Sequence, residues 1–178
     1  MSESTIRRYT DALVRHDGTA LLSCYHRHAS FSDPIHPDVR AERVGWLMRF
    51  RLARLEQVQA DTVWLAGDER KAQMLWRVRW RARRGAGREA GREVGRTRAR
   101  SLRVLSTFTL WEDEIVRQVD EFAPWAYLRQ VHGLPGLALG WLPARLDAER
   151  ERAAQALDRF IAGQPRSDSP RPGVELAS

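Results

Sequence analysis

Residues 8–34 read RYTDALVRHDGTALLSCYHRHASFSDP, and this stretch decides the predicted fold. Apolar residues recur at three- and four-residue spacing over positions 3–16, which predicts a helix that ends at His16. A second short helix is expected to run as far as Tyr25. A short strand then starts at Ala29, and Pro34 ends it because proline has no N–H to donate to a neighbouring strand.

The rest of the chain predicts one more helix and then a sheet. The loop that follows Pro34 contains Pro37, and a helix with an apolar stripe is expected at 41–56. Alternation of apolar and polar residues predicts four strands, at 58–66, 71–83, 102–110 and 115–122. This order predicts an α+β, cone-shaped fold, with N-terminal helices packed on a curved antiparallel sheet and a C-terminal helical extension.

Three parts are distinguished within the 178 residues. Residues 1–130 are expected to form the domain, with an exposed, Arg- and Gly-rich hairpin tip at 84–100. Residues 131–163 are expected to form an apolar segment, preceded by the apolar residues 124–128, and a helix that opens at Pro143 and packs on the domain. Residues 164–178 are rich in Pro and Ser and are expected to be disordered.

Composition indicates the compartment in which the protein is expected to work. Cys24 is the single cysteine, so an intrachain disulfide is excluded. The longest apolar run, Leu134 to Leu142, is shorter than the roughly 20 residues that a membrane-spanning helix needs. The N-terminus has no apolar signal core. We therefore expect a soluble, cytoplasmic protein with no membrane span.

The formal net charge is +7, and the basic residues gather in one segment. Residues 81–103 hold nine Arg and two acidic residues, Glu89 and Glu93. Contact with nucleic acid is one interpretation, and a solvated hairpin is the other. Arginine among glycines, with no aromatic residue between them, is poorly suited to stacking on bases. A nucleic-acid partner is therefore not expected.

Two segments, residues 8–34 and DEIVRQVDEFAPW at 113–125, resemble the nuclear transport factor 2-like superfamily over about residues 3–130. Its enzymes include ketosteroid isomerases, SnoaL-like polyketide cyclases and limonene epoxide hydrolases. GLPGLALGWLP, from residue 133, resembles an extension of a bacterial SnoaL-like subgroup. The resemblance implies a cupped sheet around an apolar pocket for a hydrophobic small molecule, no cofactor, and a homodimer formed through the outer sheet face.

The resemblance also implies three catalytic residues. Asp33 matches the carboxylate that moves the proton in ketosteroid isomerases, and Tyr9 matches the donor to the developing enolate oxygen. Asp120 matches the pocket carboxylate of cyclases and epoxide hydrolases. Ser106 stands where ketosteroid isomerases have a protonated Asp. Epoxide hydrolases need an Arg and an Asp two residues apart on a central strand; Arg77 and Arg79 stand there, which disfavours that reaction.

Four further residues are candidates for substrate contact. They are Arg77, Ser106, Phe108 and Trp125. The sheet face on which Arg77 lies is left open, because alternation alone does not say which of two faces is the inner one. For the same reason Trp76, Val78 and Trp80 are candidates for either the pocket or a dimer face.

Each catalytic assignment has a structural alternative. Asp33 would act as a base if an apolar wall raised its pKa, but an Asp before Pro is also common turn chemistry. Tyr9 could instead be an interior tyrosine bonded to the backbone, and Asp120 could face solvent. A metal site of His28, Asp33 and His36 can be drawn, but such clusters often arise by chance, and no metal is predicted.

The sequence therefore favours a cofactor-free isomerase or cyclase that acts on a hydrophobic carbonyl compound through an enolate. Such chemistry needs a base beside the carbon acid and donors at the oxygen where charge develops. The alternative is a non-catalytic module that binds a small ligand or forms a dimeric interaction surface.

Overall fold

The computed structural model describes residues 2–82, 99–132 and 143–165. It opens with helix α1 (Ser2–Val14), which buries Ile6, Tyr9 and Leu13 on one face. Helix α2 (Gly18–Leu22) begins directly afterwards, because the Asp17 side chain accepts a hydrogen bond from Ala20 N at 2.9 Å and caps its first turn. The second helix was expected to extend to Tyr25, but it ends at Leu22.

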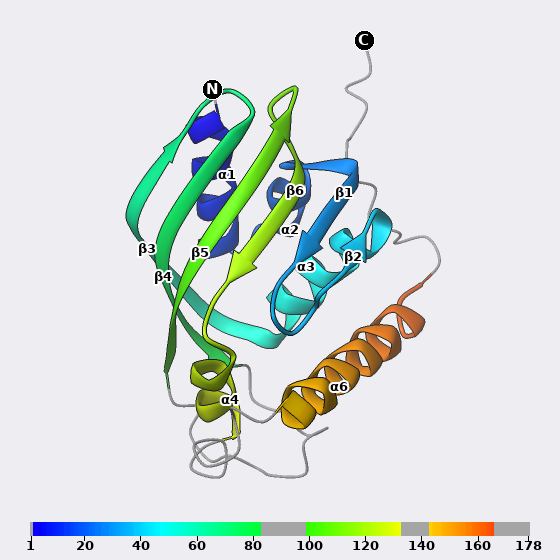
Figure 1. The fold of residues 1–178 in the computed structure, drawn as a ribbon. Helices are drawn as coiled ribbons and strands as arrows, with labels where there is room; N and C mark the ends of the chain where they lie inside the picture. The colour runs from blue at the N-terminus through cyan, green and yellow to red at the C-terminus, as the bar shows by residue number, and fades with distance from the viewer. Residues whose placement is uncertain (1, 83–98, 133–142, 166–178) are drawn as a thin grey trace.

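Within these described ranges, six strands form a single sheet in the order β2-β1-β6-β5-β4-β3. Strands β1 and β6 run parallel and all other neighbours are antiparallel. Figure 1 shows the sheet and its helices. The strands are β1 (Tyr25–Ser32), β2 (Val39–Arg40), β3 (Leu55–Gly67), β4 (Lys71–Ala82), β5 (Arg100–Trp111) and β6 (Glu114–Glu121).

The first strand and the loop after it differ from the prediction. Strand β1 starts at Tyr25 rather than Ala29, because its early residues border β6, with Tyr25 paired to Ile115. Val39 was expected in a loop but forms β2, paired to Phe31. Neither contact is local in the sequence, so alternation over a few residues did not predict it.

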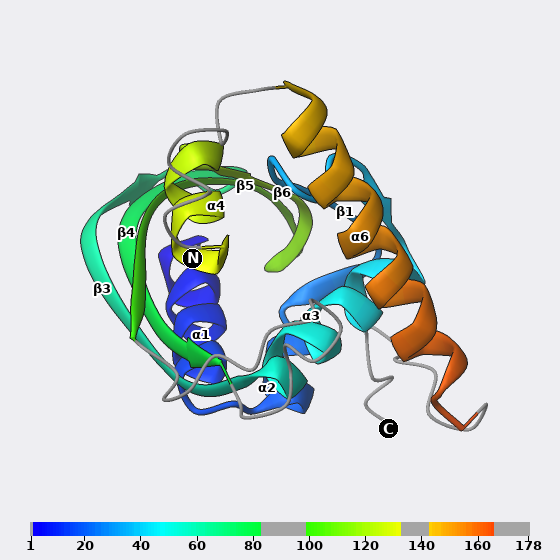
Figure 2. The same ribbon diagram turned by 90° about the horizontal axis from the view of Figure 1, so that it is seen from below.

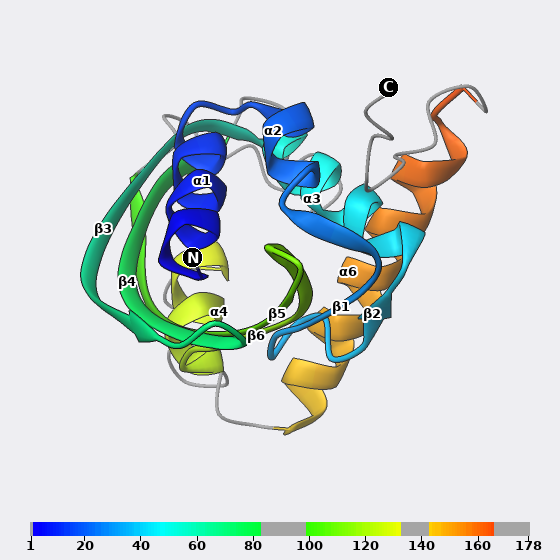
Figure 3. The same ribbon diagram turned by 90° about the horizontal axis from the view of Figure 1, so that it is seen from above.

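Helix α3 (Glu42–Arg54) follows β2 and ends where the sheet resumes at Leu55. It buries Val44, Leu47 and Met48 against the concave side of the sheet. Figures 2 and 3 show α1, α2 and α3 inside the arc of the curved sheet. The arrangement is α+β with a mixed, curved and open sheet, which confirms the predicted fold class.

Strand β4 settles which face of the sheet is the inner one. Met74 and Trp76 are buried, whereas Arg77 and Arg79 are exposed. Trp76, Val78 and Trp80 belong to the core or pack against it. The tryptophans of this strand therefore point to the concave side, and the arginines point to the convex side.

Among the residues described after β6, two helices follow the sheet. The apolar residues at 124–128 belong to helix α4 (Pro124–His132), and helix α6 (Pro143–Ala162) opens at the predicted proline. Phe160 of α6 packs edge-on against Trp46 and Phe50 of α3, with ring centroids 6.4 and 5.4 Å apart. In Figure 2, α6 lies along the outside of β1 and α3.

Some expectations concern residues outside the described ranges. The Arg/Gly hairpin tip at 84–100, except for its last two residues, and most of the tail at 164–178 lie there, as does the apolar segment at 133–142. Within the part that is described, no helix has both the length and the hydropathy needed to cross a bilayer.

Candidate functional site

The parallel pairing of β1 with β6 places Asp33 and Asp120 at the same level. Ser32, the last residue of β1, pairs with Val119 of β6, so the next residue of each chain segment is an aspartate. Both aspartates are buried, at 8% and 7% exposure. The sequence separates them by 87 positions, and the β1–β6 pairing places them at one end of two neighbouring strands.

Asp120 is held by donors on the concave face of β5 and β6. Ser106 Oγ donates to Asp120 Oδ1 at 2.6 Å, and Gln118 Nε2 donates to the same oxygen at 2.9 Å. Trp76 Nε1 donates to Ser106 Oγ at 2.9 Å, which leaves the serine proton for Asp120. No described residue forms a hydrogen bond with Asp120 Oδ2.

The surroundings of Asp120 disfavour its charge. Burial raises the pKa of Asp120 to about 6, although the hydrogen bonds from Gln118 and Ser106 and the charge of Arg51 act in the opposite direction. A carboxyl with a pKa near 6 exchanges a proton readily close to neutral pH, which general acid–base catalysis requires. The structure thus places Asp120 in the interior and not toward solvent.

Tyr9 joins the same network through Gln118. Gln118 Nε2 donates to Tyr9 Oη at 3.3 Å, and the Tyr25 hydroxyl donates to Gln118 Oε1. Burial raises the pKa of Tyr9, and the carboxylate of Asp120 adds to the elevation. Tyr9 therefore keeps its proton at neutral pH, and the amide that donates to its oxygen leaves that proton free to be donated elsewhere.

Asp33 has a different environment, crowded with donors. Its Oδ1 accepts hydrogen bonds from Ile35 N at 2.7 Å and from His36 N at 2.6 Å. The His36 ring nitrogen Nδ1 lies 3.3 Å from the same oxygen, and the Arg51 guanidinium donates to Oδ2. These contacts are the turn chemistry that the Asp-Pro sequence offered as the alternative to catalysis.

The pKa of Asp33 is consequently lowered. Burial acts to raise it, but Arg51 and the hydrogen bonds from His36 outweigh burial and bring the pKa to about 2. The condition for Asp33 as a base, an apolar wall that raises its pKa, is therefore not met. These contacts support the structural alternative for Asp33, because an anion paired with a guanidinium and two backbone N–H groups is a poor proton acceptor.

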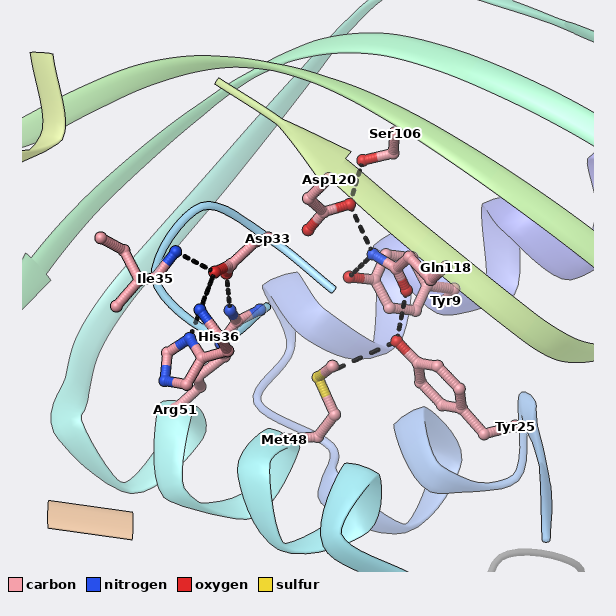
Figure 4. A network of polar contacts seen from close by, with 10 residues as sticks. All are labelled: Tyr9, Tyr25, Asp33, Ile35, His36, Met48, Arg51, Ser106, Gln118 and Asp120. Atoms are coloured by element: carbon pink, nitrogen blue, oxygen red, sulfur yellow. Dashed lines mark hydrogen bonds and ion pairs between the residues drawn. The ribbon is translucent and has the colours of Figure 1, made fainter. Parts of the chain in front are cut away.

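Arg51 links the two aspartates and was not predicted as a site residue. It extends from α3 over the Phe31 ring, with its Cζ 4.5 Å from the ring centroid. Its charge lowers the pKa of both Asp33 and Asp120. Figure 4 shows Asp33, His36 and Arg51 together on one side of the site, facing Asp120, Gln118 and Tyr9 on the other.

Tyr127 of α4 extends the site toward the C-terminal helices. Burial raises the pKa of Tyr127 to about 12, and the carboxylates of Glu149 and Asp33 add to the elevation. Tyr127 packs at a tilt on Phe122, with ring centroids 5.9 Å apart. Helix α6 reaches the loop after Asp33 through Arg150, whose Nε donates to the Pro34 carbonyl at 2.9 Å.

The predicted substrate contacts divide into inner and outer residues. Ser106 and Phe108 are fully buried on the concave face, and Phe108 packs edge-on against Tyr9 at 5.7 Å between centroids. Arg77 is exposed on the convex face, so its assignment to substrate binding is corrected by the alternation of β4. Trp125 is 50% exposed and lies under Arg129, whose Cζ is 5.3 Å from the ring.

The histidines do not gather around Asp33 as a metal site would require. His36 contacts Asp33, but His28 is exposed and packs against His26 with ring centroids 5.5 Å apart. Among the described residues, His, Cys, Asp and Glu form no group of three that is arranged to hold a metal ion.

Two signals in the sequence point to the residues that were missed. Arg51 occupies a position on the apolar stripe of α3, between Met48 and Leu52, where a charge must find a buried partner. Gln118 and Asp120 are two residues apart on β6 and so share one face of the strand. A polar pair on a buried face is a stronger indication of a site than either residue alone.

Comparison with solved structures identifies the fold. An epoxide hydrolase of the limonene epoxide hydrolase-like kind from Mycobacterium tuberculosis superposes with a TM-score of 0.59 at 12% identity, over 78% of this chain and 95% of its own. A protein from Shewanella denitrificans assigned to the SnoaL-like polyketide cyclases gives 0.62 at 16% identity, over 73% and 96%.

A third similar structure contains a bound small molecule. It comes from Catenulispora acidiphila, has a ketosteroid isomerase-like fold in complex with trimethylamine, and gives a TM-score of 0.60 at 14% identity over 78% of this chain and 97% of its own. No family model and no curated protein matches the sequence. At these identities the likeness shows the fold alone, and it agrees with the predicted resemblance.

Proposed function

We propose that this chain, a protein with the nuclear transport factor 2-like fold, is a cofactor-free isomerase or cyclase that moves a proton beside a carbonyl group. One observation carries the proposal: a buried carboxylate with a pKa of about 6 lies in one hydrogen-bond network with a protonated tyrosine. The substrate class is a hydrophobic carbonyl compound, held on the concave side of the sheet.

In this proposal Asp120 is the general base, with Oδ2 as the reacting oxygen. Above pH 6 it is mostly ionised, and it takes a proton from the carbon next to the carbonyl. The electron pair of the broken C–H bond forms the enolate double bond, and negative charge develops on the carbonyl oxygen. Because burial disfavours the Asp120 charge, the transfer of the proton to Asp120 relieves a cost that the folded protein already bears.

Tyr9 is the donor to the developing enolate oxygen. The amide of Gln118 occupies a lone pair of Tyr9 Oη, so the hydroxyl proton points away from Gln118. The Tyr25 hydroxyl fixes the orientation of that amide by donating to its oxygen. Gln118 is thus a positioning residue for both Tyr9 and Asp120.

Two outcomes are open to the enolate. In an isomerase, protonated Asp120 returns the proton to another carbon of the conjugated system. In a cyclase, the enolate carbon attacks a second carbonyl of the same substrate, a C–C bond forms, and the new alkoxide takes up a proton. The first step is the same in both reactions, and it requires no redox partner.

Arg51 and Asp33 form the wall opposite the base. Since Asp33 already holds Arg51, the guanidinium is engaged and adds no free positive charge for an anionic substrate. An uncharged ligand suits a site in which the described charges are Asp33, Arg51 and Asp120. The fold neighbours include proteins named as a cyclase and an epoxide hydrolase, and one holds trimethylamine, which supports a ligand site in this fold.

The direct test is exchange of a carbon-bound proton for deuterium. A panel of cyclic and aromatic-fused ketones would be incubated with the protein in D₂O, and loss of the α-proton signals would be followed by NMR. We expect exchange above the buffer rate for ketones that bind, and we expect Asp120→Asn to abolish it. Ketones that bind without any enhanced exchange would contradict the proposed chemistry.

The alternative is a non-catalytic module that holds an apolar ligand. The burial of Tyr9, Ser106 and Gln118 in one hydrogen-bond network favours it, because such a network also serves as a rigid specificity element. The same experiment separates the two: a bound ligand recovered unchanged, with equal affinity for the Asp120→Asn variant, supports binding alone.

A further inference from the structure

The convex face of the sheet carries a row of exposed arginines beside an exposed tryptophan. Arg77, Arg79 and Arg81 alternate with buried or half-buried residues along β4, and Arg103 of β5 is paired directly opposite Arg77. All four are exposed. Helices α1, α2 and α3 lie on the other side of the sheet, as Figures 2 and 3 show.

Most of this positive charge is not neutralised by the part of the chain that is described. Asp61 stands opposite Arg77 but pairs with Arg79, with Oδ2 2.7 Å from the guanidinium. Arg77, Arg81 and Arg103 form no ion pair with a described residue. Like charges placed directly opposite across two strands are destabilising, so the Arg77–Arg103 pair favours a bound anion.

The next row on the same face is apolar from β3 to β5 and ends at the exposed Glu121 of β6, which pairs with Leu105. Trp64 of β3 pairs with Leu75 of β4, and Leu75 pairs with Leu105 of β5. Leu75 and Leu105 are half-buried, whereas Trp64 is 46% exposed and Val63 beside it is 57% exposed. A β-bulge at residues 62–64 shifts the register there. An aromatic ring thus stands beside the arginines.

We propose that this face, made of Trp64, Arg77, Arg79, Arg81 and Arg103, binds single-stranded nucleic acid. From Arg77 to Arg81 the strand rises about 14 Å, which is too long for one phosphate and suits a run of them. Unpaired bases can stack on Trp64, whereas bases within a duplex present no free face to it. The sequence argued against such a partner because aromatic residues were missing among the arginines; the sheet supplies one from another strand.

Charge complementarity favours a polyanion over two other occupants. A second copy of this chain would place its own arginine row against this one. An acidic peptide would neutralise the arginines, but its carboxylates would not stack on the exposed Trp64 indole. The inference does not depend on the chemistry proposed for Asp120, which lies on the opposite face of the sheet.

The test is fluorescence anisotropy of the full chain with a fluorescein-labelled poly-dT 20-mer across a salt series. The proposal expects the logarithm of the association constant to fall linearly with the logarithm of the salt concentration. Arg77→Ala combined with Arg103→Ala should lower that slope by roughly 1.4, about 0.7 for each phosphate of a single strand that is no longer neutralised. Trp64→Ala should weaken binding roughly 5- to 150-fold, because one base can no longer stack on the indole.

The matched control is Arg7→Ala combined with Arg15→Ala, which removes the same charge from exposed positions on and just after α1. It should leave the affinity within a factor of about two. The proposal is overturned if the control weakens binding as much as the β4–β5 pair, or if Trp64→Ala has no effect. Binding of a duplex as tight as that of the single strand would also overturn it. So would a dimer, seen by sedimentation, that dissociates in the Arg77→Ala variant. All these positions are exposed, so thermal midpoints should stay close to that of the parent.

Discussion

Asp33 and Asp120 lie at the same level of two paired strands, are buried to the same extent, and yet have opposite electrostatic environments. Asp33 accepts from two backbone N–H groups and from Arg51, so its pKa falls to about 2. Asp120 accepts from two neutral side chains, and burial raises its pKa to about 6. The number and charge of the donors, rather than burial, therefore separate the pKa values of the two aspartates.

The two aspartates also contribute to stability with opposite signs. A pKa lowered from 3.8 to about 2 stabilises the folded state by about 2 kcal/mol above pH 4, and this contribution disappears as the pH falls toward 2. A pKa raised from 3.8 to about 6 destabilises the folded state by about 3 kcal/mol above pH 6, and this penalty disappears as the pH falls toward 4.

Replacement of Asp120 by Asn should give the largest effect. The proton acceptor is lost, and removal of a general base lowers turnover by about 10²- to 10⁴-fold. The stability should move in the other direction: the free energy of unfolding at pH 7 should rise by up to about 3 kcal/mol, because the buried charge is gone while the amide oxygen can still accept from Ser106 and Gln118. Turnover or exchange assays and urea unfolding at pH 7 would measure both quantities.

A variant that loses turnover and gains stability is hard to obtain by replacing a purely structural aspartate. If Asp120→Asn destabilises the protein at pH 7, its charge is stabilised in the folded state and the raised pKa is wrong. Ser106→Ala serves as the companion variant. It removes one donor to Asp120 Oδ1 and should raise the carboxyl pKa further without removing the base.

Replacement of Tyr9 by Phe should lower turnover by about 10²-fold, since one donor to the developing oxyanion is lost. It should not change the pH at which activity rises, because that midpoint belongs to Asp120. The pH–rate profile of the variant, compared with that of the parent, measures both. Tyr25→Phe is the matched control: it removes a hydroxyl of the same network that donates to Gln118 and has no proposed contact with the substrate, so its effect on turnover should be smaller. An equal loss in both variants would remove the distinct role of Tyr9.

Replacement of Asp33 by Asn should mainly affect stability. The charge that is stabilised by Arg51 is lost, and the free energy of unfolding at pH 7 should fall by about 2 kcal/mol or more, because Arg51 is left without its partner. Below pH 2 the parent carboxyl is itself protonated, so the difference between the two proteins should shrink there. Urea unfolding over pH 2–7 gives this comparison. A loss of turnover as large as that of Asp120→Asn, with unchanged stability, would return the role of base to Asp33.

The fold could be predicted because its signals are local. The spacing of Ile6, Tyr9 and Leu13 marks α1, and the alternation from Met74 to Trp80 marks β4, whatever the rest of the chain does. The strand limits at Tyr25 and Val39 could not be predicted, since they depend on pairing with β6 and with Phe31, which are set by the folded sheet.

The site was predicted only in part, for a similar physical reason. The sequence identifies which residues can carry charge, but a pKa depends on the groups that surround the carboxyl in space. Asp33 and Asp120 looked alike until α3 brought Arg51 to one and β5 brought Ser106 to the other. The face occupied by Arg77 was undecided for a related reason: alternation gives two faces but does not say which of them is concave.

The smallest expected effect connects the two aspartates through Arg51. Its charge lowers the pKa of Asp120, so Arg51→Gln should move the midpoint of the pH–rate profile upward from about 6. Asp33 acts on Asp120 in the opposite direction, which makes the double replacement of Asp33 by Asn and Arg51 by Gln informative. The midpoint of the double variant should lie closer to that of the parent than the Arg51→Gln midpoint does, because both opposing charges are gone. Arg7→Gln on α1, an exposed charge change, should leave the midpoint in place. If the midpoint of the pH–rate profile did not move in Arg51→Gln, the Arg51 charge would not act on Asp120. Arg51 would then interact with Asp33 alone.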